Sequence, residues 1–251
     1  MTGMQKTVLV TGGARGIGRA TCLAAARAGY RVAFNYLADD AAAAGLVAEI
    51  ESGGGTAMAL RADVALEADV DRLFAAIDAR FGRLDALVNN AGITGPAGRF
   101  MDTDRATIDS VLRVNVTGMM DCCRAAAARM ATGRGGVGGA IVNVSSGAAT
   151  TGAPFTYVWY GAAKAAVEAF TRGLAAEVAA EGIRVNCISP GVTATDIHRS
   201  SGRNQGLEEL ARTIPVGRAA TPEEIAGPIL YLMSDAASYI VGSVLRVGGG
   251  R

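Results

Sequence analysis

The sequence contains little of the side-chain chemistry that metal centres and disulfide-bonded folds require. His198 is the single histidine, and the four cysteines show no C-x-x-C spacing. Structural zinc sites draw mainly on cysteine and histidine, and disulfide frameworks are typical of short, cysteine-rich secreted chains. We therefore expect neither a metal site nor a disulfide framework. The cysteines are Cys22, Cys122, Cys123 and Cys187.

Long hydrophobic runs and blocks of one charge are also missing. No apolar stretch approaches the roughly 20 residues of a membrane-spanning helix, and the first residues do not resemble a secretion signal. The 24 basic and 23 acidic side chains give a net charge of +1. Without a charge block, the chain has no feature that attracts nucleic acid or an anionic membrane. We expect a cytoplasmic protein with a small-molecule substrate.

Short apolar runs alternate with helical patterns along the whole chain. No linker, repeat or change of composition divides the 251 residues, so residues 1–251 are expected to form a single domain. Alternating strands and helices predict an α/β fold, a doubly wound parallel sheet of about seven strands with helices on both faces. The expected strands are 7–11, 31–36, 56–60, 85–89, 140–145, 183–188 and 243–247. The expected helices are 17–28, 39–52, 67–81, 104–131, 159–181 and 222–234.

A glycine-rich turn follows the first expected strand. The apolar run 7–11 leads into Gly12, Gly16 and Gly18, and an alanine-rich helical stretch follows. A turn between a strand and a helix can bring backbone N–H groups against a pyrophosphate. The spacing G-x-x-x-G-x-G differs from the commoner G-x-G-x-x-G, so the turn alone leaves open a structural role without a ligand. The second glycine-rich stretch, 133–139, precedes a strand and is expected to be a surface loop.

A tyrosine and a lysine stand four residues apart in the expected helix 159–181. This spacing places Tyr160 and Lys164 on one helix face. A nearby ammonium is expected to lower the tyrosine pKa and so to make the phenol an acid/base group. Ser146 ends the fifth expected strand, fourteen residues upstream of Tyr160, and the adjacent Ser145 is the alternative serine. On its own, the Tyr–Lys pair also fits a solvated helix surface.

Eight short motifs, taken together and in order, resemble the short-chain dehydrogenase/reductase family over essentially the whole chain. This family has a Rossmann-type fold, as the alternating pattern also predicts. The motifs are Thr11-Gly12-x-x-x-Gly16-Ile17-Gly18, Asp63-Val64, Asn89-Asn90-Ala91-Gly92, Asn115, Ser146, Tyr160-x-x-x-Lys164, Pro190-Gly191 and Thr195.

The resemblance implies hydride transfer between a nicotinamide and a carbonyl or secondary alcohol. The branch resembled contains 3-oxoacyl-carrier-protein reductases and glucose-dehydrogenase-like enzymes, so carbonyl reduction of a 3-oxoacyl, small ketone or sugar-like substrate is expected. Tyr160 would exchange the proton, Ser146 would hold the oxygen, and Lys164 would bind the ribose. Asn115 would hold a water through its backbone carbonyl. The alternative is a catalytically inactive nucleotide-sensing protein, which would be expected to lose the tyrosine or the lysine.

The resemblance also assigns cofactor contacts to the ends of the strands. Asp63 and Val64 would meet the adenine, and 90–92 would flank the adenosine ribose, although both segments also fit ordinary strand-end turns. Residues 190–195 would hold the carboxamide. The expected cofactor-binding residues are Gly12, Arg15, Gly16, Ile17, Gly18, Tyr36, Asp63, Val64, Asn90, Ala91, Gly92, Tyr160, Lys164, Pro190, Gly191, Val192 and Thr195.

The end of the second strand bears on the choice of cofactor. An acidic residue there binds the ribose 2′-hydroxyl of NAD. The sequence continues Phe34-Asn35-Tyr36-Leu37, with no acid before Asp39. Arg15, in the glycine turn, can reach a 2′-phosphate, and a guanidinium suits that group. We therefore predict NADP(H), with NAD(H) as the alternative.

A substrate lid is expected over about 192–213, because 196–213 is polar and contains two glycines. His198 is expected to be solvated there. Tyr157, which has no lysine four residues later, fits either the lining of the substrate pocket or packing, together with two nearby aromatic residues. These are Phe155 and Trp159. The lid residues considered for substrate contact are Arg199, Arg203 and Arg212.

A homotetramer with two-fold symmetry is the commonest assembly of the resembled enzymes and is expected here. The helix from Trp159 to Ala180 is rich in alanine and contains Gly161 and Gly173, which permit close approach of another helix. The final apolar segment, Tyr239 to Gly249, would leave a sheet edge that a partner could cover. Both segments also fit packing within one subunit.

Overall fold

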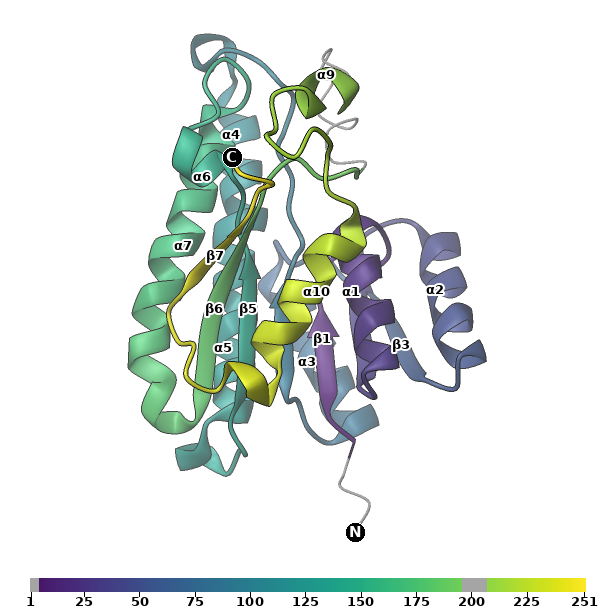
Figure 1. The fold of residues 1–251 in the computed structure, drawn as a ribbon. Helices are drawn as coiled ribbons and strands as arrows, with labels where there is room; N and C mark the ends of the chain where they lie inside the picture. The colour runs from purple at the N-terminus through teal and green to yellow at the C-terminus, as the bar shows by residue number, and fades with distance from the viewer. Residues whose placement is uncertain (1–4, 196–206) are drawn as a thin grey trace.

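The computed structural model describes residues 5–195 and 207–251 and contains one seven-stranded sheet (Figure 1). The strand order is β3-β2-β1-β4-β5-β6-β7, and all the strand pairs are parallel. This confirms the doubly wound α/β fold that the alternating pattern predicts. The strands are β1 Thr7–Val10, β2 Arg31–Tyr36, β3 Thr56–Arg61, β4 Ala86–Asn89, β5 Gly139–Val144, β6 Ile183–Pro190 and β7 Val244–Val247.

Helices cover both faces of the sheet and form two separate cores with it. One core joins α1, α2 and α10 to the sheet, and the other joins α3, α5 and α7. The central strands are buried on both faces, which explains why β1 reads as a continuous apolar run rather than an alternating one. The helices are α1 Gly16–Arg27, α2 Asp40–Ser52, α3 Glu67–Phe81, α4 Arg105–Leu112, α5 Gly118–Met130, α6 Ala148–Thr151, α7 Val158–Val178, α9 Leu207–Ala211 and α10 Pro222–Met233.

The expected helix 104–131 is interrupted. A π-helical turn, Arg113–Thr117, separates α4 from α5, and the Gly118 N–H reaches back to the Arg113 carbonyl. Gly118 also passes close to the loop after β3: a Cβ added there would lie 2.2 Å from the Val64 carbonyl oxygen. The turn therefore lies beside a segment expected to bind the cofactor, and it contains Asn115.

The order of the strands places a crevice above the centre of the sheet. From β1 the chain moves outward through β2 and β3, and it then returns to the other side of β1 with β4. Connections leave such a reversal point in opposite directions, so ligands of open α/β sheets bind there, beyond the carboxyl ends of the strands. The glycine-rich segment 133–139 is mostly exposed and enters β5 at the opposite end, as a surface loop.

Two further expectations concern helices. The capping box at the start of α10 is present, with the Thr221 side chain and the Glu224 carboxylate each accepting the other's backbone N–H. Within 5–195 and 207–251, no helix is both long and apolar enough to cross a bilayer.

Candidate active site

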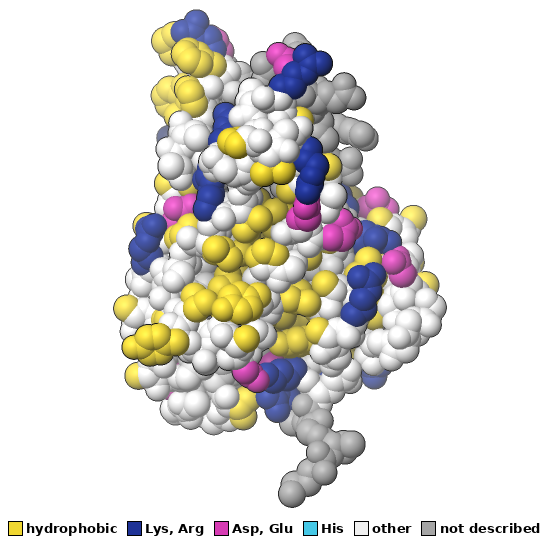
Figure 2. All heavy atoms as spheres, viewed as in Figure 1, with side chains coloured by type: hydrophobic (Ala, Val, Ile, Leu, Met, Phe, Trp, Pro, Cys, Tyr) yellow, Lys and Arg dark blue, Asp and Glu magenta, His cyan; other side chains and the backbone are white. Residues whose placement is uncertain are grey.

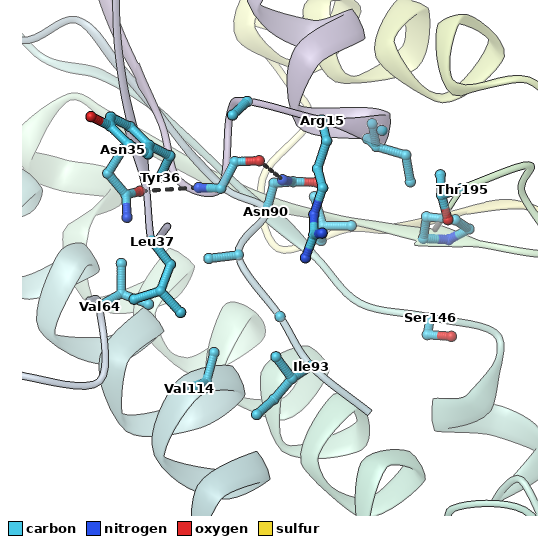
Figure 3. Close-up of a pocket in the computed structure, with 18 of the residues that line it drawn as sticks. Arg15, Asn35, Tyr36, Leu37, Val64, Asn90, Ile93, Val114, Ser146 and Thr195 are labelled. Carbon is cyan, nitrogen blue, oxygen red and sulfur yellow. Dashed lines mark hydrogen bonds between the residues drawn. The ribbon is translucent and has the colours of Figure 1, made fainter. Parts of the chain in front are cut away.

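A cavity of about 380 Å³ opens at the carboxyl ends of β1, β2, β4, β5 and β6 (Figure 3). Its lining residues come from segments that are distant in the sequence, from the glycine turn near the start of the chain to the end of β6. Most of the residues expected at the site line it. They are Gly12, Arg15, Gly16, Ile17, Tyr36, Asp63, Val64, Asn90, Ala91, Gly92, Ser146, Tyr160, Lys164, Pro190, Gly191 and Thr195.

The glycine turn is held tightly against the loop after β4. Gly12 has φ +64°, and a Cβ there would lie 3.0 Å from the Ala91 Cα. The Asn90 side chain donates to the carbonyls of Thr11 and Gly12, at 2.9 and 3.1 Å. Gly18 lies behind the turn rather than in the cavity, since a Cβ there would be 2.3 Å from the Gly12 oxygen. Gly18 therefore shapes the turn from behind.

The first turn of α1 is suited to an anion. Its N-cap residue, Arg15, provides no side-chain cap, and the turn contains no acidic residue. The first N–H groups of a helix lack partners within the helix and carry the positive end of its dipole. The Arg15 side chain extends into the cavity (Figure 3) and forms no ion pair with any residue of 5–195 or 207–251.

The acidic groups at this end of the cavity are engaged by their own segments. Asp39 accepts a hydrogen bond from the Ala42 N–H at 2.9 Å and so caps α2. Asp63 accepts one from the Ala65 N–H at 2.9 Å, which is the turn role left open for it by the sequence. The Tyr36 hydroxyl bonds to Asp40, and this bond raises the tyrosine pKa. The end of β2 thus presents Tyr36 and Leu37 to the cavity.

Tyr160 and Ser146 face each other at the other end of the cavity. Burial raises the pKa of the Tyr160 hydroxyl, and its hydrogen bond with Ser146 lowers it in part. Ser145 points toward α7 instead: its Oγ lies 2.9 Å from Glu168 Oε1 and 3.1 Å from the Lys164 carbonyl, and donates to them. Ser146 is therefore the serine beside the tyrosine.

Lys164 does not lower the pKa of Tyr160 below its ordinary value in this structure, so that expectation is wrong. The Lys164 Nζ donates to the Val144 carbonyl at 2.8 Å and lies 5.7 Å from the centre of the tyrosine ring. Burial is the largest cause of the pKa shift of both Tyr160 and Lys164. It raises the pKa of the phenol and lowers the pKa of the ammonium to about 8.

Asn115 lies behind the cavity wall, next to Gly92. Its Nδ2 donates to the carbonyls of Ile93 and Val111, both at 2.8 Å. Its Oδ1 is buried without a hydrogen-bond partner among the described residues. A Cβ at Gly92 would lie 2.7 Å from this oxygen and 3.4 Å from the Lys164 Nζ. Because Gly92 has no Cβ, the Asn115 and Lys164 side chains can both lie close to it.

The segment after β6 reaches the cavity at Pro190, Gly191, Thr193 and Thr195. Val192 does not line the cavity; its carbonyl accepts a hydrogen bond from the Ala220 N–H at 3.0 Å. The segment 192–213, where a lid is expected, is described only in part. Arg199, Arg203 and His198 lie outside the described residues, and Arg212 is exposed after α9.

Two of the three aromatic residues near Tyr160 pack beneath it. Tyr157 and Trp159 are buried and absent from the cavity lining, so packing is the correct alternative for them. Tyr157 meets the Tyr160 ring edge-on at 5.4 Å. The Trp159 Nε1 donates to the Thr94 carbonyl at 2.7 Å. Phe155, in contrast, is 79% exposed.

Some lining residues carry no signal in the sequence motifs. Leu37 and Val114 line one end of the cavity beside the expected Val64, with Ile93 nearby (Figure 3). Asn35 also reaches it, accepting from the Gly12 N–H at 3.0 Å and donating to the Ala62 carbonyl at 2.8 Å. A polar residue inside an otherwise apolar strand was the available signal for Asn35. The sequence contained no signal for the apolar lining residues outside the motifs, because an apolar residue at a cavity cannot be distinguished in sequence from an ordinary core residue.

Comparisons with known proteins agree with this site. A family model described as Enoyl-(Acyl carrier protein) reductase matches residues 12–251. The uncharacterized oxidoreductase YgfF of Escherichia coli is 47% identical over 97% of this chain and 98% of its own. A 3-oxoacyl-[acyl-carrier-protein] reductase of Synechocystis is 40% identical over 98% of this chain and 96% of its own. An L-rhamnose 1-dehydrogenase (NAD(P)(+)) of Sphingomonas is also 40% identical, over 98% of this chain and 95% of its own.

The chain belongs to the short-chain dehydrogenase/reductase family. A solved short-chain dehydrogenase from Burkholderia cenocepacia, in complex with NADP, has a TM-score of 0.89 to this structure. It is 34% identical and covers 98% of each chain. The chain is thus an oxidoreductase of this family, and its Tyr160, Lys164 and Ser146 lie in the cavity beyond the strand ends.

Proposed function

We propose that this short-chain dehydrogenase/reductase uses NADPH to reduce a carbonyl group to a secondary alcohol. The observation that carries the cofactor choice is the Arg15 guanidinium, which extends into the cavity without an ion-pair partner among the described residues. Asp39, the first acid after β2, is turned to the cap of α2. A 2′-phosphate fits beside an unpaired guanidinium, whereas NAD binding commonly uses a carboxylate at the end of β2.

The reaction needs one proton and one hydride for each carbonyl. When bound, NADPH would supply the hydride to the carbonyl carbon. The Tyr160 hydroxyl gives its proton to the carbonyl oxygen, so that a C–H bond and an O–H bond form as the C=O double bond becomes single. The Ser146 hydroxyl donates a hydrogen bond to the same oxygen and stabilises the charge that develops there.

Burial raises the pKa of the Tyr160 hydroxyl and so favours its protonated form, as a proton donor requires. The Lys164 ammonium is held at the strand end by the Val144 carbonyl, where it can bind the ribose hydroxyls. Asn115 completes this set behind Gly92, and its backbone carbonyl would hold a water for proton return. We assign these roles to Asn115, Ser146, Tyr160 and Lys164.

Exposed apolar side chains on the two segments that follow the cavity residues Ile93 and Ser146 favour a substrate with an apolar chain. Phe100, Met101 and Phe155 are exposed, at 58%, 79% and 79%. They lie on two segments that lead away from the cavity and are joined by a hydrogen bond from the Gly98 N–H to the Thr156 carbonyl, 2.7 Å long. Phe155 also has φ +62°, an uncommon backbone angle for a bulky residue. A 3-oxoacyl thioester fits this surface better than a sugar does.

Substrate turnover tests the proposal directly. Oxidation of NADPH and of NADH would be followed with 3-oxoacyl thioesters of increasing chain length, and reduction of NADP⁺ with L-rhamnose. We expect NADPH to be preferred and kcat/KM to rise with chain length. Preference for NADH, or efficient oxidation of L-rhamnose with no activity on thioesters, would contradict it. Binding of NADPH without turnover of any carbonyl would favour the nucleotide-sensing alternative.

We also propose that the protein works in the cytoplasm as a homotetramer. All four cysteines are buried and free, which suits a reducing compartment. Hydrophobic side chains gather over α10 and β7 with few charges among them (Figure 2). β7 pairs only with β6 in the described sheet and leaves an edge for a partner to cover.

A further inference from the structure

Two loops lie at the proposed adenosine end of the cavity, and side chains of α3 help to connect them. Helix α3 itself does not line the cavity. Leu37 follows β2, and Asp63 and Val64 follow β3; all three line this end of the cavity, where Figure 3 labels Leu37 and Val64. The pairing of β2 with β3 ends at Tyr36 and Arg61, and the Ala62 N–H donates to the Tyr36 carbonyl at 3.0 Å. Leu37 and Asp63 are the first residues beyond this pairing. The side chains that connect them come from the end of β3 and the first turns of α3.

Four hydrogen bonds make this connection. The Arg61 Nε donates to the Leu37 carbonyl at 3.1 Å, and the Arg61 carbonyl accepts from Arg72 Nη2 at 3.0 Å. Arg72 Nη1 donates to Asp69 Oδ1 at 2.6 Å. Asp69 Oδ2 accepts from the Asp63 N–H at 2.8 Å. The series thus begins at Leu37 and ends on the backbone of Asp63.

The start of α3 explains why Asp69 points toward Asp63. The N-cap residue is Leu66, which has no side-chain acceptor. Asp69 is the third residue of the helix, the position from which an acidic side chain reaches back in a capping box. Here the carboxylate reaches past Leu66 to the Asp63 N–H. The same bond is the largest cause of the lowered pKa of Asp69, ahead of the bond from Arg72.

We infer that Asp69 and Arg72 are positioning residues for the nucleotide: they fix the Asp63–Val64 loop against Leu37 so that the adenosine fits between them. The inference rests on the proposed use of NADP(H). Neither residue lines the cavity, so their effect on the ligand acts through the backbone of 61–63 and through Arg61. The chemistry at Tyr160 lies at the other end of the cavity and is independent of them.

Nucleotide binding to the full-length protein tests the inference. Asp69→Ala and Arg72→Gln would be compared with the parent by calorimetric titration of NADPH and of 2′,5′-ADP, which lacks the nicotinamide. We expect Asp69→Ala to raise both Kd values by the same factor, about tenfold, with kcat at saturating NADPH nearly unchanged. Asp69→Asn keeps an acceptor for the Asp63 N–H and should recover part of the affinity.

Asp121→Ala is the matched control. Asp121 also pairs with an arginine three residues later, Arg124, at 3.0 Å, but on α5 and without a bond to a cavity loop. Its Kd values should equal those of the parent. Equal Kd values in the Asp69 variants and in this control, or a loss confined to NADPH and absent for 2′,5′-ADP, would overturn the inference. A parent protein that binds neither nucleotide would instead overturn the NADP(H) assignment together with it.

Discussion

At the level of single residues, the chemistry at Tyr160 depends on which groups are buried with it. The motif predicts the tyrosine, the lysine and their shared helix face, and the structure brings both into the cavity with Ser146. The motif does not predict the pKa of the tyrosine, because desolvation depends on how closely Val111, Tyr157, Trp159 and Ala163 pack around the ring. For the same reason, the choice between Ser145 and Ser146 was decided by Glu168, on a different element.

Tyr160→Phe is expected to lower kcat by about 10²- to 10⁴-fold, since the variant lacks the proton that the carbonyl oxygen receives. The ring, and its edge-on contact with Tyr157, remain. Steady-state kinetics and NADPH titration would measure the two effects separately, and the Kd for NADPH should stay close to that of the parent. Tyr157→Phe is the control, because that ring packs under the site. A Tyr160→Phe variant with parental kcat would contradict the assigned role.

Arg15→Ala is expected to weaken NADPH binding by about ten- to a hundredfold, which corresponds to about 1.5–3 kcal/mol for a charge-assisted contact to the 2′-phosphate. NADH lacks this phosphate and should lose little affinity. Arg19→Ala is the matched control: this arginine lies one turn further along α1 and pairs with Glu49 instead of entering the cavity. Titrations that show equal losses for both cofactors would remove Arg15 as the discriminating residue.

At the level of elements, periodicity predicted the seven strands and the long helices to within a few residues at most ends. It did not predict the π turn before α5 or the short α6, since both depend on contacts between distant segments. The interval between Ser146 and Tyr160 contains α6 and a loop with two residues of positive φ, Ala153 and Phe155. The glycine spacing predicted the turn at α1, but the contact between Gly18 and Gly12 required the structure.

Two helical glycines should respond to alanine in opposite ways. Gly45, within α2, has nothing within 4 Å of an added Cβ, so Gly45→Ala should stabilise the protein by roughly 0.5–1 kcal/mol. Gly18→Ala would place its Cβ against the Gly12 carbonyl and should destabilise by about 1–3 kcal/mol. It should also abolish NADPH binding. Thermal unfolding with and without NADPH measures both changes; a Gly18→Ala variant with parental Tm and Kd would show that the turn tolerates displacement.

At the level of the whole molecule, the buried thiols set a limit on stability at high pH. Burial raises the pKa of Cys122 and of Cys187 to about 12, and it also raises those of Cys22 and Cys123. In the unfolded chain these thiols lose protons near their ordinary pKa of about 9, so the unfolded state binds fewer protons above that pH. The contribution of the thiols to the free energy of unfolding should therefore not change with pH below pH 9. It should fall as the pH rises from 9 toward 12.

Denaturant titrations of the parent and of Cys187→Ala at pH 7 and pH 10 would measure this dependence. The loss between the two pH values should be smaller in the variant, because one thiol no longer ionises in the unfolded state. In the native protein at pH 8, a thiol reagent should modify none of the four cysteines rapidly. Rapid modification of Cys187 would contradict its burial, and an equal pH dependence in both proteins would contradict the role of the thiols.

The exposed face of α7 bears on the proposed homotetramer. Small residues repeat along it at helical spacing, namely Ala162, Ala165, Ala169, Gly173 and Ala176, and all are exposed in the single chain. Gly161 serves a contact within the subunit, since a Cβ there would lie 2.9 Å from the Gly152 carbonyl of the loop after α6. Gly173 differs, because nothing lies within 4 Å of a Cβ added to it. Such a smooth stripe permits the close approach of the same helix from a partner.

Gly173→Glu tests this assembly, because the substitution meets nothing within the subunit but would place a charge between two close helices. We expect light scattering to give the parent about four times the 25.4 kDa of one chain at micromolar concentration. The variant should have half that mass, with the contact through α10 and β7 retained. Gly45→Glu, at the equally open site on α2, should leave the mass unchanged. A parent of one chain's mass would refute the assembly, and a Gly173→Glu variant of parental mass would show that α7 faces solvent in it.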